Sequence, residues 1–238
     1  PTNTKYDPGD VRRSGREPSG ASDATTAFNS ALAGKGTCLA ADGVYRIDGT
    51  VTINENQSVR LSKGARLIRK ASASTSTAPV VHIKGNWSLL EGGSVWSENN
   101  SPNGVVCCGH LDVSTSSWNS VHWEFRNCWV YCRDFGGASA APYPDDDDGI
   151  GVYIPSSQPH LGSSSVNYFG TLQNIKVHNA TIAYMLTDLA NGHTFVNCSF
   201  HGIYWYGFRL HGAYGNSFYG GFLEFAHKNG VMGIWLAP

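Results

Sequence analysis

The chain has 238 residues, 15% of them charged, and a formal net charge of −1. This length suffices for one domain with a sizeable core, and the lack of a basic stripe argues against nucleic acid as a partner. No apolar run approaches the roughly 18 residues that a membrane-spanning helix needs, so we expect no membrane insertion. The 28 glycines and the many aromatic residues favour a β-rich, turn-rich protein over a disordered one.

The N-terminal part begins with a polar stretch and continues into one predicted helix. Residues 1–21 contain Pro and Gly, which predicts a linker or lead-in. Residues 22–34 predict a short helix with Asp23 as N-cap and Gly34 as its end. Its apolar residues share one face, which must cover something, so we expect this helix to cap the first coil of the following structure.

Short strands are predicted from residue 37 onward. In each, apolar and polar residues alternate, and turns rich in Gly, Asp or Asn separate one from the next. The predicted strands are residues 37–40, 43–47, 50–53, 58–61, 65–68, 80–83, 87–90, 104–107 and 121–125.

A seven-residue pattern then occurs four times, at residues 125–131, 172–178, 195–201 and 218–224. An apolar residue comes first, Asn or Gly third, an apolar residue sixth and a polar or aromatic residue seventh. The last three copies are 23 residues apart, and the first lies 47 residues, roughly two periods, upstream. A fixed period of this length without helical spacing predicts a solenoid of short stacked strands.

The segment at residues 133–170 interrupts the period and is expected to be a loop insertion around a strand at residues 149–154. Four consecutive Asp residues at 145–148 predict either a solvated loop tip or a source of a second carboxylate or cation site. Their spacing does not match a calcium loop, so we expect no metal. Residues 230–238 still predict part of a further turn of the solenoid, so we expect the parent protein to continue, or a partner to cover this end.

The six cysteines do not form a metal-binding pattern. Cys128 and Cys198 occupy the fourth position of their copies, which predicts small interior or turn residues. We expect free thiols rather than a disulfide framework.

Residues 23–31, 36–47 and 51–53 carry a family resemblance: an Asp-initiated helix, a strand, a Gly-x-Tyr-x-Ile strand and a third strand. They resemble the N-terminal part of pectate-lyase-like right-handed parallel β-helix proteins, and specifically of phage tailspikes and tail-fibre depolymerases. The resemblance implies an all-β fold, with residues 22–238 forming a single right-handed parallel β-helix. It also implies a homotrimer in a virion tail, or alternatively a secreted protein, with a bacterial surface polysaccharide as partner and no cofactor.

Stacking the copies places their seventh residues, Tyr131, His178, His201 and Glu224, in one outward column. Glu224 is the candidate general acid or base, with His201 and His178 positioning it or transferring protons. The alternative is an ordinary solvated polar ladder. Asp188 is a candidate second carboxylate, although it is expected on a different face or at a corner.

The remaining candidates would bind the substrate, with core or subunit-interface packing as the alternative for the aromatic residues. They are Tyr131, Tyr204, Trp205, Arg209 and Tyr219. The leading hypothesis is a depolymerase, with a glycoside hydrolase favoured over a lyase that would use His201, Arg209 and Tyr131. A non-catalytic receptor-binding module is the second hypothesis, and a secreted pectinolytic enzyme is the third.

Overall fold

The computed structural model describes residues 4–70, 78–98, 101–109, 119–132, 149–156, 166–187, 190–203, 206–221, 223–224 and 232–237. These residues form an all-β molecule with parallel sheets, one 3-10 helix and one α-helix. Within these ranges, no helix is long and apolar enough to cross a bilayer.

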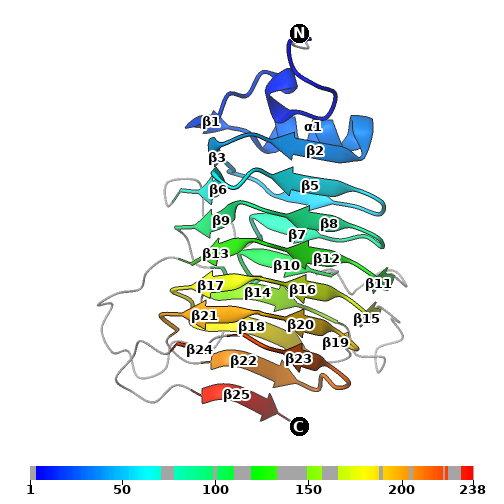
Figure 1. The fold of residues 1–238 in the computed structure, drawn as a ribbon, viewed down its shortest axis with the longest axis vertical. Helices are drawn as coiled ribbons and strands as arrows, with labels where there is room; N and C mark the ends of the chain where they lie inside the picture. Colours follow the sequence, from blue (N-terminus) through cyan, green and yellow to red (C-terminus); the bar gives the residue numbers. More distant parts are fainter. Residues whose placement is uncertain are drawn as a thin grey trace.

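Three long parallel sheets run the length of the molecule (Figure 1). Sheet I contains β1 (Ser19–Asp23), β3 (Gly43–Arg46), β6 (Ala65–Arg69), β9 (Ser94–Ser97), β13 (Trp129–Tyr131), β17 (Lys176–His178), β21 (Ser199–His201) and β24 (Leu223–Glu224). Sheet II contains β2 (Thr37–Ala40), β5 (Ser58–Leu61), β8 (Leu89–Glu91), β12 (Glu124–Arg126), β16 (Thr171–Gln173), β20 (Thr194–Val196) and β23 (Ser217–Tyr219). Sheet III contains β4 (Val51–Ile53), β7 (Val81–Ile83), β10 (Val106–Cys108), β14 (Ile150–Ile154), β18 (Ile182–Thr187), β22 (Tyr206–His211) and β25 (Met232–Ala237).

The chain passes from a strand of sheet II to one of sheet I and then to one of sheet III, and it repeats this course. Each strand pairs in parallel with its counterpart one coil further along, as β16 pairs with β20 and β17 with β21. A small fourth sheet adds β11 (Asn119–Val121), β15 (Val166–Tyr168) and β19 (Ala190–Asn191). Figure 1 shows the resulting stack of coils, an arrangement consistent with a parallel β-helix.

The seven-residue copies stack as predicted. Phe125, Leu172, Phe195 and Phe218 are register partners along sheet II, and the first three are buried in the interior. One part of the prediction is wrong: the 47-residue interval is a single coil rather than two periods, because Phe125 pairs directly with Leu172. The extra residues of this coil fall between β13 and β14 and between β14 and β15.

The α-helix α1 (Thr25–Lys35) lies at the N-terminal end of the stack (Figure 1). Its buried Phe28 packs edge-on against Tyr45, with ring centroids 5.4 Å apart. The predicted limits need correction, because Ala24 is the N-cap residue and Gly36 ends the helix in a left-handed conformation. Asp23 instead ends β1, where its carboxylate accepts hydrogen bonds from Thr25 N and Asp48 N, both at 3.0 Å.

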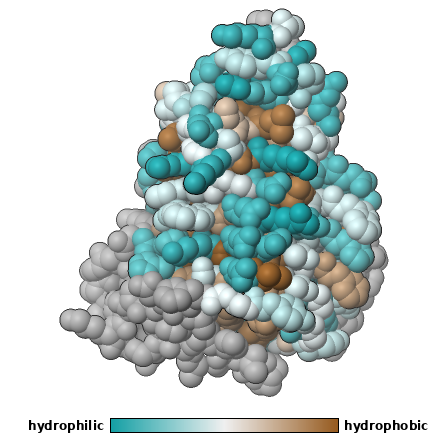
Figure 2. Space-filling view, viewed as in Figure 1, coloured by the Kyte–Doolittle hydropathy of each residue, from teal (hydrophilic) through white to brown (hydrophobic). Residues whose placement is uncertain are grey.

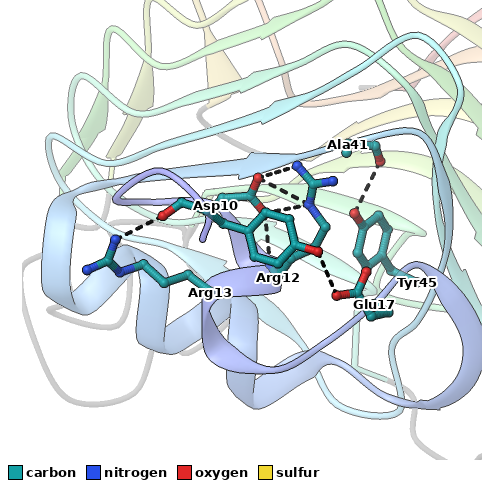
Figure 3. A network of polar contacts seen from close by, with 7 residues as sticks. Asp10, Arg12, Arg13, Glu17, Ala41 and Tyr45 are labelled. Carbon is teal, nitrogen blue, oxygen red and sulfur yellow. Dashed lines mark hydrogen bonds and ion pairs between the residues drawn. The ribbon is translucent and has the colours of Figure 1, made fainter. Parts of the chain in front are cut away.

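The first residues, predicted to be a linker or lead-in, contact the first coil. The 3-10 helix η1 (Val11–Ser14) contains a fully buried Val11, and Leu39 N donates to Gly9 O at 2.9 Å. Figure 3 shows Asp10 accepting hydrogen bonds from Arg12, whose Nη2 lies 2.6 Å from Oδ2. Burial alone would raise the pKa of Asp10, but the hydrogen bonds from Arg12 lower it overall. Asp10 is therefore held as a carboxylate beside the first coil.

Asparagines form a ladder at the corner between sheets II and I. Asn127, Asn174 and Asn197 all have left-handed backbones, with φ of 53°, 54° and 50°. Asn174 Nδ2 donates to Asn127 Oδ1 at 2.8 Å, and Asn197 Nδ2 donates to Asn174 Oδ1 at 3.4 Å. Asn tolerates this conformation better than most residues, so the third position of the pattern is a structural turn residue.

The cysteines are free and buried, and Cys128 and Cys198 lie in the interior as predicted. Burial raises the pKa of the Cys198 thiol to about 11, so it stays protonated at neutral pH. These side chains serve as small apolar residues of the core.

Candidate functional site

The predicted outward column lies on sheet I. Tyr131, His178, His201 and Glu224 are consecutive register partners on β13, β17, β21 and β24. The residues immediately before the three rings are buried, namely Val130, Val177 and Phe200. Tyr131, His178 and His201 themselves are half-buried. Successive side chains of a strand point to opposite sides of the sheet, so these rings face outward from the coil.

The column extends one coil beyond the prediction, to Trp96 on β9. The Trp96 and Tyr131 rings stack with centroids 3.9 Å apart and planes inclined by 18°. Tyr131 stacks on His178 at 4.5 Å and 8°. His201 follows at 5.6 Å from His178 but is tilted by 56°. The parallel rings therefore cover one another's faces, while the His201 ring turns out of the stack.

A second outward column runs beside the first and contains the more exposed aromatic ring. Trp129 is 50% exposed, and its ring is tilted against Tyr131 at 6.1 Å and against His178 at 5.7 Å. Lys176 Nζ lies 5.8 Å from the Trp129 centroid, and the Arg66 guanidinium lies 5.7 Å from the Trp96 centroid.

We call these outward side chains of β6, β9, β13, β17 and β21 the aromatic–histidine face. It consists of Arg66, Ser94, Trp96, Trp129, Tyr131, Lys176, His178, Ser199 and His201.

On this face a neutral phenol lies beside the positive charges of Arg66 and Lys176. Burial raises the pKa of Tyr131, with the charge of Arg66 acting in the opposite direction, so the phenol is neutral near pH 7. A phenol and two imidazoles can donate and accept hydrogen bonds, and the imidazoles can also transfer protons. Among the described residues, no group of three or more His, Cys, Asp or Glu side chains is placed to hold a metal ion.

The structure places two of the other candidates on different sheets. Arg209 lies on β22 of sheet III, where it is a register partner of Met185. Tyr219 lies on β23 of sheet II, is 59% exposed and is a register partner of Val196. The prediction placed both in one substrate-binding group with Tyr131. The three residues occupy different positions within their coils and therefore lie on three different sheets.

Several candidates fall outside what the structure describes. Asp188, Tyr204, Trp205 and the four Asp residues at 145–148 lie outside the described residues. The backbone of Glu224 is described as part of β24, in register with His201, but its side chain is not.

Sequence reasoning missed four charged or aromatic residues of the face: Arg66, Trp96, Trp129 and Lys176. One signal could have found Trp96, because residues 90–96 read Leu-Glu-Gly-Gly-Ser-Val-Trp and fit the seven-residue pattern. Leu90 and Trp96 are the register partners of Phe125 and Tyr131, so this is a further copy. The other three occupy the fifth position of a copy or its equivalent, which also points outward.

Figure 2, in the same view as Figure 1, shows mainly hydrophilic side chains over the described coils, with separate hydrophobic patches between them. Outside the aromatic–histidine face, Trp87 and Phe169 are 63% and 55% exposed, and both lie against His122 at a corner next to sheet II.

No protein-family model and no curated protein sequence matches the chain. Its structure is similar to that of the Dettilon tailspike protein, with a TM-score of 0.58 and 16% identity, covering 86% of this chain and 38% of that one. It is also similar to PfbA, a surface adhesin of Streptococcus pneumoniae, with a TM-score of 0.53 and 14% identity, covering 88% of this chain and 61% of that one. A second PfbA structure gives a TM-score of 0.52 at 14% identity, covering 84% of this chain and 63% of that one.

The chain thus spans less than two thirds of the length of each of these proteins. At such low identity the similarity concerns the fold. The chain has the fold of a tailspike-like parallel β-helix protein, as the resemblance of residues 23–53 indicated.

Proposed function

We propose that this chain is the right-handed parallel β-helix part of a tailspike-type protein that binds a bacterial surface polysaccharide on its aromatic–histidine face. The supporting observation is the continuous row of Trp96, Tyr131, His178 and His201 beside the exposed Trp129. Sugars present apolar C–H surfaces and many hydroxyls, which suit aromatic rings interleaved with hydrogen-bonding groups. A row that repeats with the coils suits a polymer better than a small molecule.

The shared fold of a tailspike and a surface adhesin supports a role at a bacterial surface. We place the chain in a virion tail as a homotrimer, with a secreted protein as the alternative. Binding without cleavage, as in a receptor-binding module, is the alternative function.

Cleavage of the bound polysaccharide is the second part of the proposal. It is favoured by the register that sets Glu224 next to His201, since a carboxyl group and an imidazole are suited to general acid and base roles. Hydrolysis needs a second carboxylate, for which Asp188 and residues 145–148 are the candidates. Elimination is the alternative reaction, with His201 or Tyr131 removing the proton.

The test is to incubate the purified protein with a panel of bacterial capsular and O-antigen polysaccharides, and to measure both binding and small products by mass spectrometry. Products that have gained water establish a hydrolase, and unsaturated products establish a lyase. Binding without products establishes the receptor-binding alternative. A folded protein that neither binds nor cleaves any polysaccharide of the panel contradicts the proposal.

Two matched tryptophan variants test the location of the binding site. Trp129→Ala should weaken polysaccharide binding about tenfold, because an exposed ring beside Lys176 is lost from the centre of the face. Trp87→Ala removes a ring of similar exposure at a corner next to sheet II and should leave binding unchanged. Equal effects of the two substitutions would place the site elsewhere.

A further inference from the structure

Within the described part of the chain, the aromatic–histidine face carries positive charge that no ion pair compensates. Arg66 on β6 is exposed and Lys176 on β17 is half-buried, and neither forms an ion pair within the described part of the chain. The other outward residues from β9 to β21 are serines, aromatic residues and histidines. The acidic residue in register with this face, Glu224, stands at its C-terminal end. At its other end, Arg46 is neutralised by Asp48 at 2.7 Å.

Sheet II shows that this imbalance is not a general property of the coils. Arg60, Glu91 and Arg126 are successive register partners there, so positive and negative side chains alternate along the sheet. Glu124 adds a second carboxylate and forms an ion pair with Arg126. The outward charges of sheet II therefore balance, whereas those of the aromatic–histidine face do not.

Each of the two cations sits beside a tryptophan. The Arg66 guanidinium lies over Trp96 and the Lys176 ammonium lies over Trp129, both within the range of cation–π attraction. Such a pair offers a sugar unit an apolar surface and a positive charge side by side. β6 and β17 are three strand spacings apart, about 14 Å at the usual interstrand distance. The two charges can thus contact different units of one extended chain.

We infer that the ligand of this face is an acidic polysaccharide, bearing uronic-acid carboxylates that bind at Arg66 and Lys176. This inference rests on the proposed function and specifies its substrate class. Uncompensated surface cations attract an anionic polymer, and a guanidinium or ammonium group forms charge-assisted hydrogen bonds with carboxylates. A neutral polysaccharide would leave both charges without a partner.

The experiment compares carboxylate-bearing capsular polysaccharides with the same polymers after chemical reduction of their carboxyl groups, and with neutral dextran. Binding to the intact protein is measured by biolayer interferometry at about 50 mM and about 300 mM salt, because screening weakens contacts between exposed charges. The variants are Arg66→Gln, Lys176→Gln and the double substitution, with Arg60→Gln on sheet II as the matched control. Circular dichroism verifies that each variant is folded.

The expected result is that an acidic polymer binds more weakly at high salt and loses about tenfold or more in affinity after carboxyl reduction. Arg66→Gln and Lys176→Gln should each weaken binding about three- to fivefold, while Arg60→Gln leaves it unchanged. The comparison of native and reduced polymer on the unaltered protein needs no variant to fold.

Two other results would overturn the inference in different ways. If native and reduced polymers bind alike and the substitutions have no effect, the ligand is not recognised by its charge, and the proposed polysaccharide-binding function still stands. If no polysaccharide binds to the folded protein at all, the proposed function fails, and the inference fails with it.

Discussion

The outer faces of sheets I and II are built from the same coils but carry different chemistry. On sheet II, arginines and glutamates compensate one another, as Glu124 and Arg126 do. On sheet I, stacked rings run from Trp96 to His178, and Arg66 and Lys176 have no ion-pair partner within the described ranges. The interior is mainly apolar beneath both faces, although Arg69 and Ser97 of sheet I are also buried. The backbone therefore sets where side chains point, and the identity of the outward residues gives each face its chemistry.

The largest expected effect is on the rate of polysaccharide cleavage, and it compares a glutamate of sheet I with a glutamate of sheet II. Glu224→Gln should reduce polysaccharide cleavage about 10²- to 10⁴-fold, because the proposed general acid or base, in register with His201, is removed. Glu91→Gln, on sheet II, should leave the rate unchanged. The rate is measured from small products by mass spectrometry. Equal rates for Glu224→Gln and the unaltered protein would remove Glu224 from the reaction.

The next largest effect is on the pH dependence of stability and concerns a buried histidine. His193 lies just before β20 of sheet II and is buried, whereas His178 and His201 of sheet I face outward. Burial lowers the pKa of His193 to about 4, below the ordinary value near 6.5. Between these values the unfolded state binds more protons than the folded state, so stability falls as the pH is lowered through this window. The loss should reach about 3 kcal/mol in the free energy of unfolding.

The measurement is urea unfolding at pH 7 and at about pH 4. His193→Gln should lower stability at pH 7, since the hydrogen bond from Gly170 N is altered, and should also reduce the change between the two pH values. His122→Gln, at an exposed corner, should keep the full change. If the change in the free energy of unfolding between the two pH values is as large in His193→Gln as in the unaltered protein, other groups cause it.

A smaller effect tests the corner that joins the two faces. Asn174→Ala should lower the free energy of unfolding by about 2 kcal/mol, because it loses ladder hydrogen bonds and keeps a left-handed backbone that Ala disfavours. Asn174→Gly loses the same bonds without the backbone penalty, so it should lose about 1 kcal/mol. Denaturant midpoints distinguish the two, and equal losses would show that the backbone conformation is not limiting.

The smallest effect compares two tyrosines. Tyr131→Ala should weaken polysaccharide binding about fivefold, because the support between Trp96 and His178 is lost. Tyr131→Phe keeps the stack and should bind nearly as well as the unaltered protein. Tyr219→Ala, on sheet II, should have no effect on affinity measured by biolayer interferometry. A loss in Tyr219→Ala alone would move the site to sheet II.

Much of the fold followed from the sequence because a strand repeats its side-chain direction every two residues. The copies at 172–178, 195–201 and 218–224 keep a fixed spacing, so their alignment was predictable. The copy at 125–131 was predicted to lie two periods before the copy at 172–178, whereas the two are neighbours. The long segments within this one coil lengthen the interval, so the spacing alone does not give the register. The helix limits were missed for a local reason, since Asp23 bonds to Asp48 N across the coil as well as to Thr25 N.

The candidate site was predictable to a lesser extent. The fixed spacing identified Tyr131, His178, His201 and Glu224 as neighbours, whereas Arg209 and Tyr219 were grouped with them without knowledge of their sheets. Trp96 and Arg66 were missed because the coils before residue 125 vary in length, so a constant period does not reach them.

The sequence by itself determined that this protein stacks short strands, that its inward residues are mostly apolar and that one outward column contains two histidines. These features are local or periodic, and alternation and spacing record them directly. Only the tertiary structure decided which columns share a face, that Trp96 and Tyr131 stack, and that Arg66 and Lys176 lie beside tryptophans without ion-pair partners in the described part of the chain. The physical reason is that register between coils depends on how many residues each turn and loop contains, and a residue's neighbours across strands follow from that register.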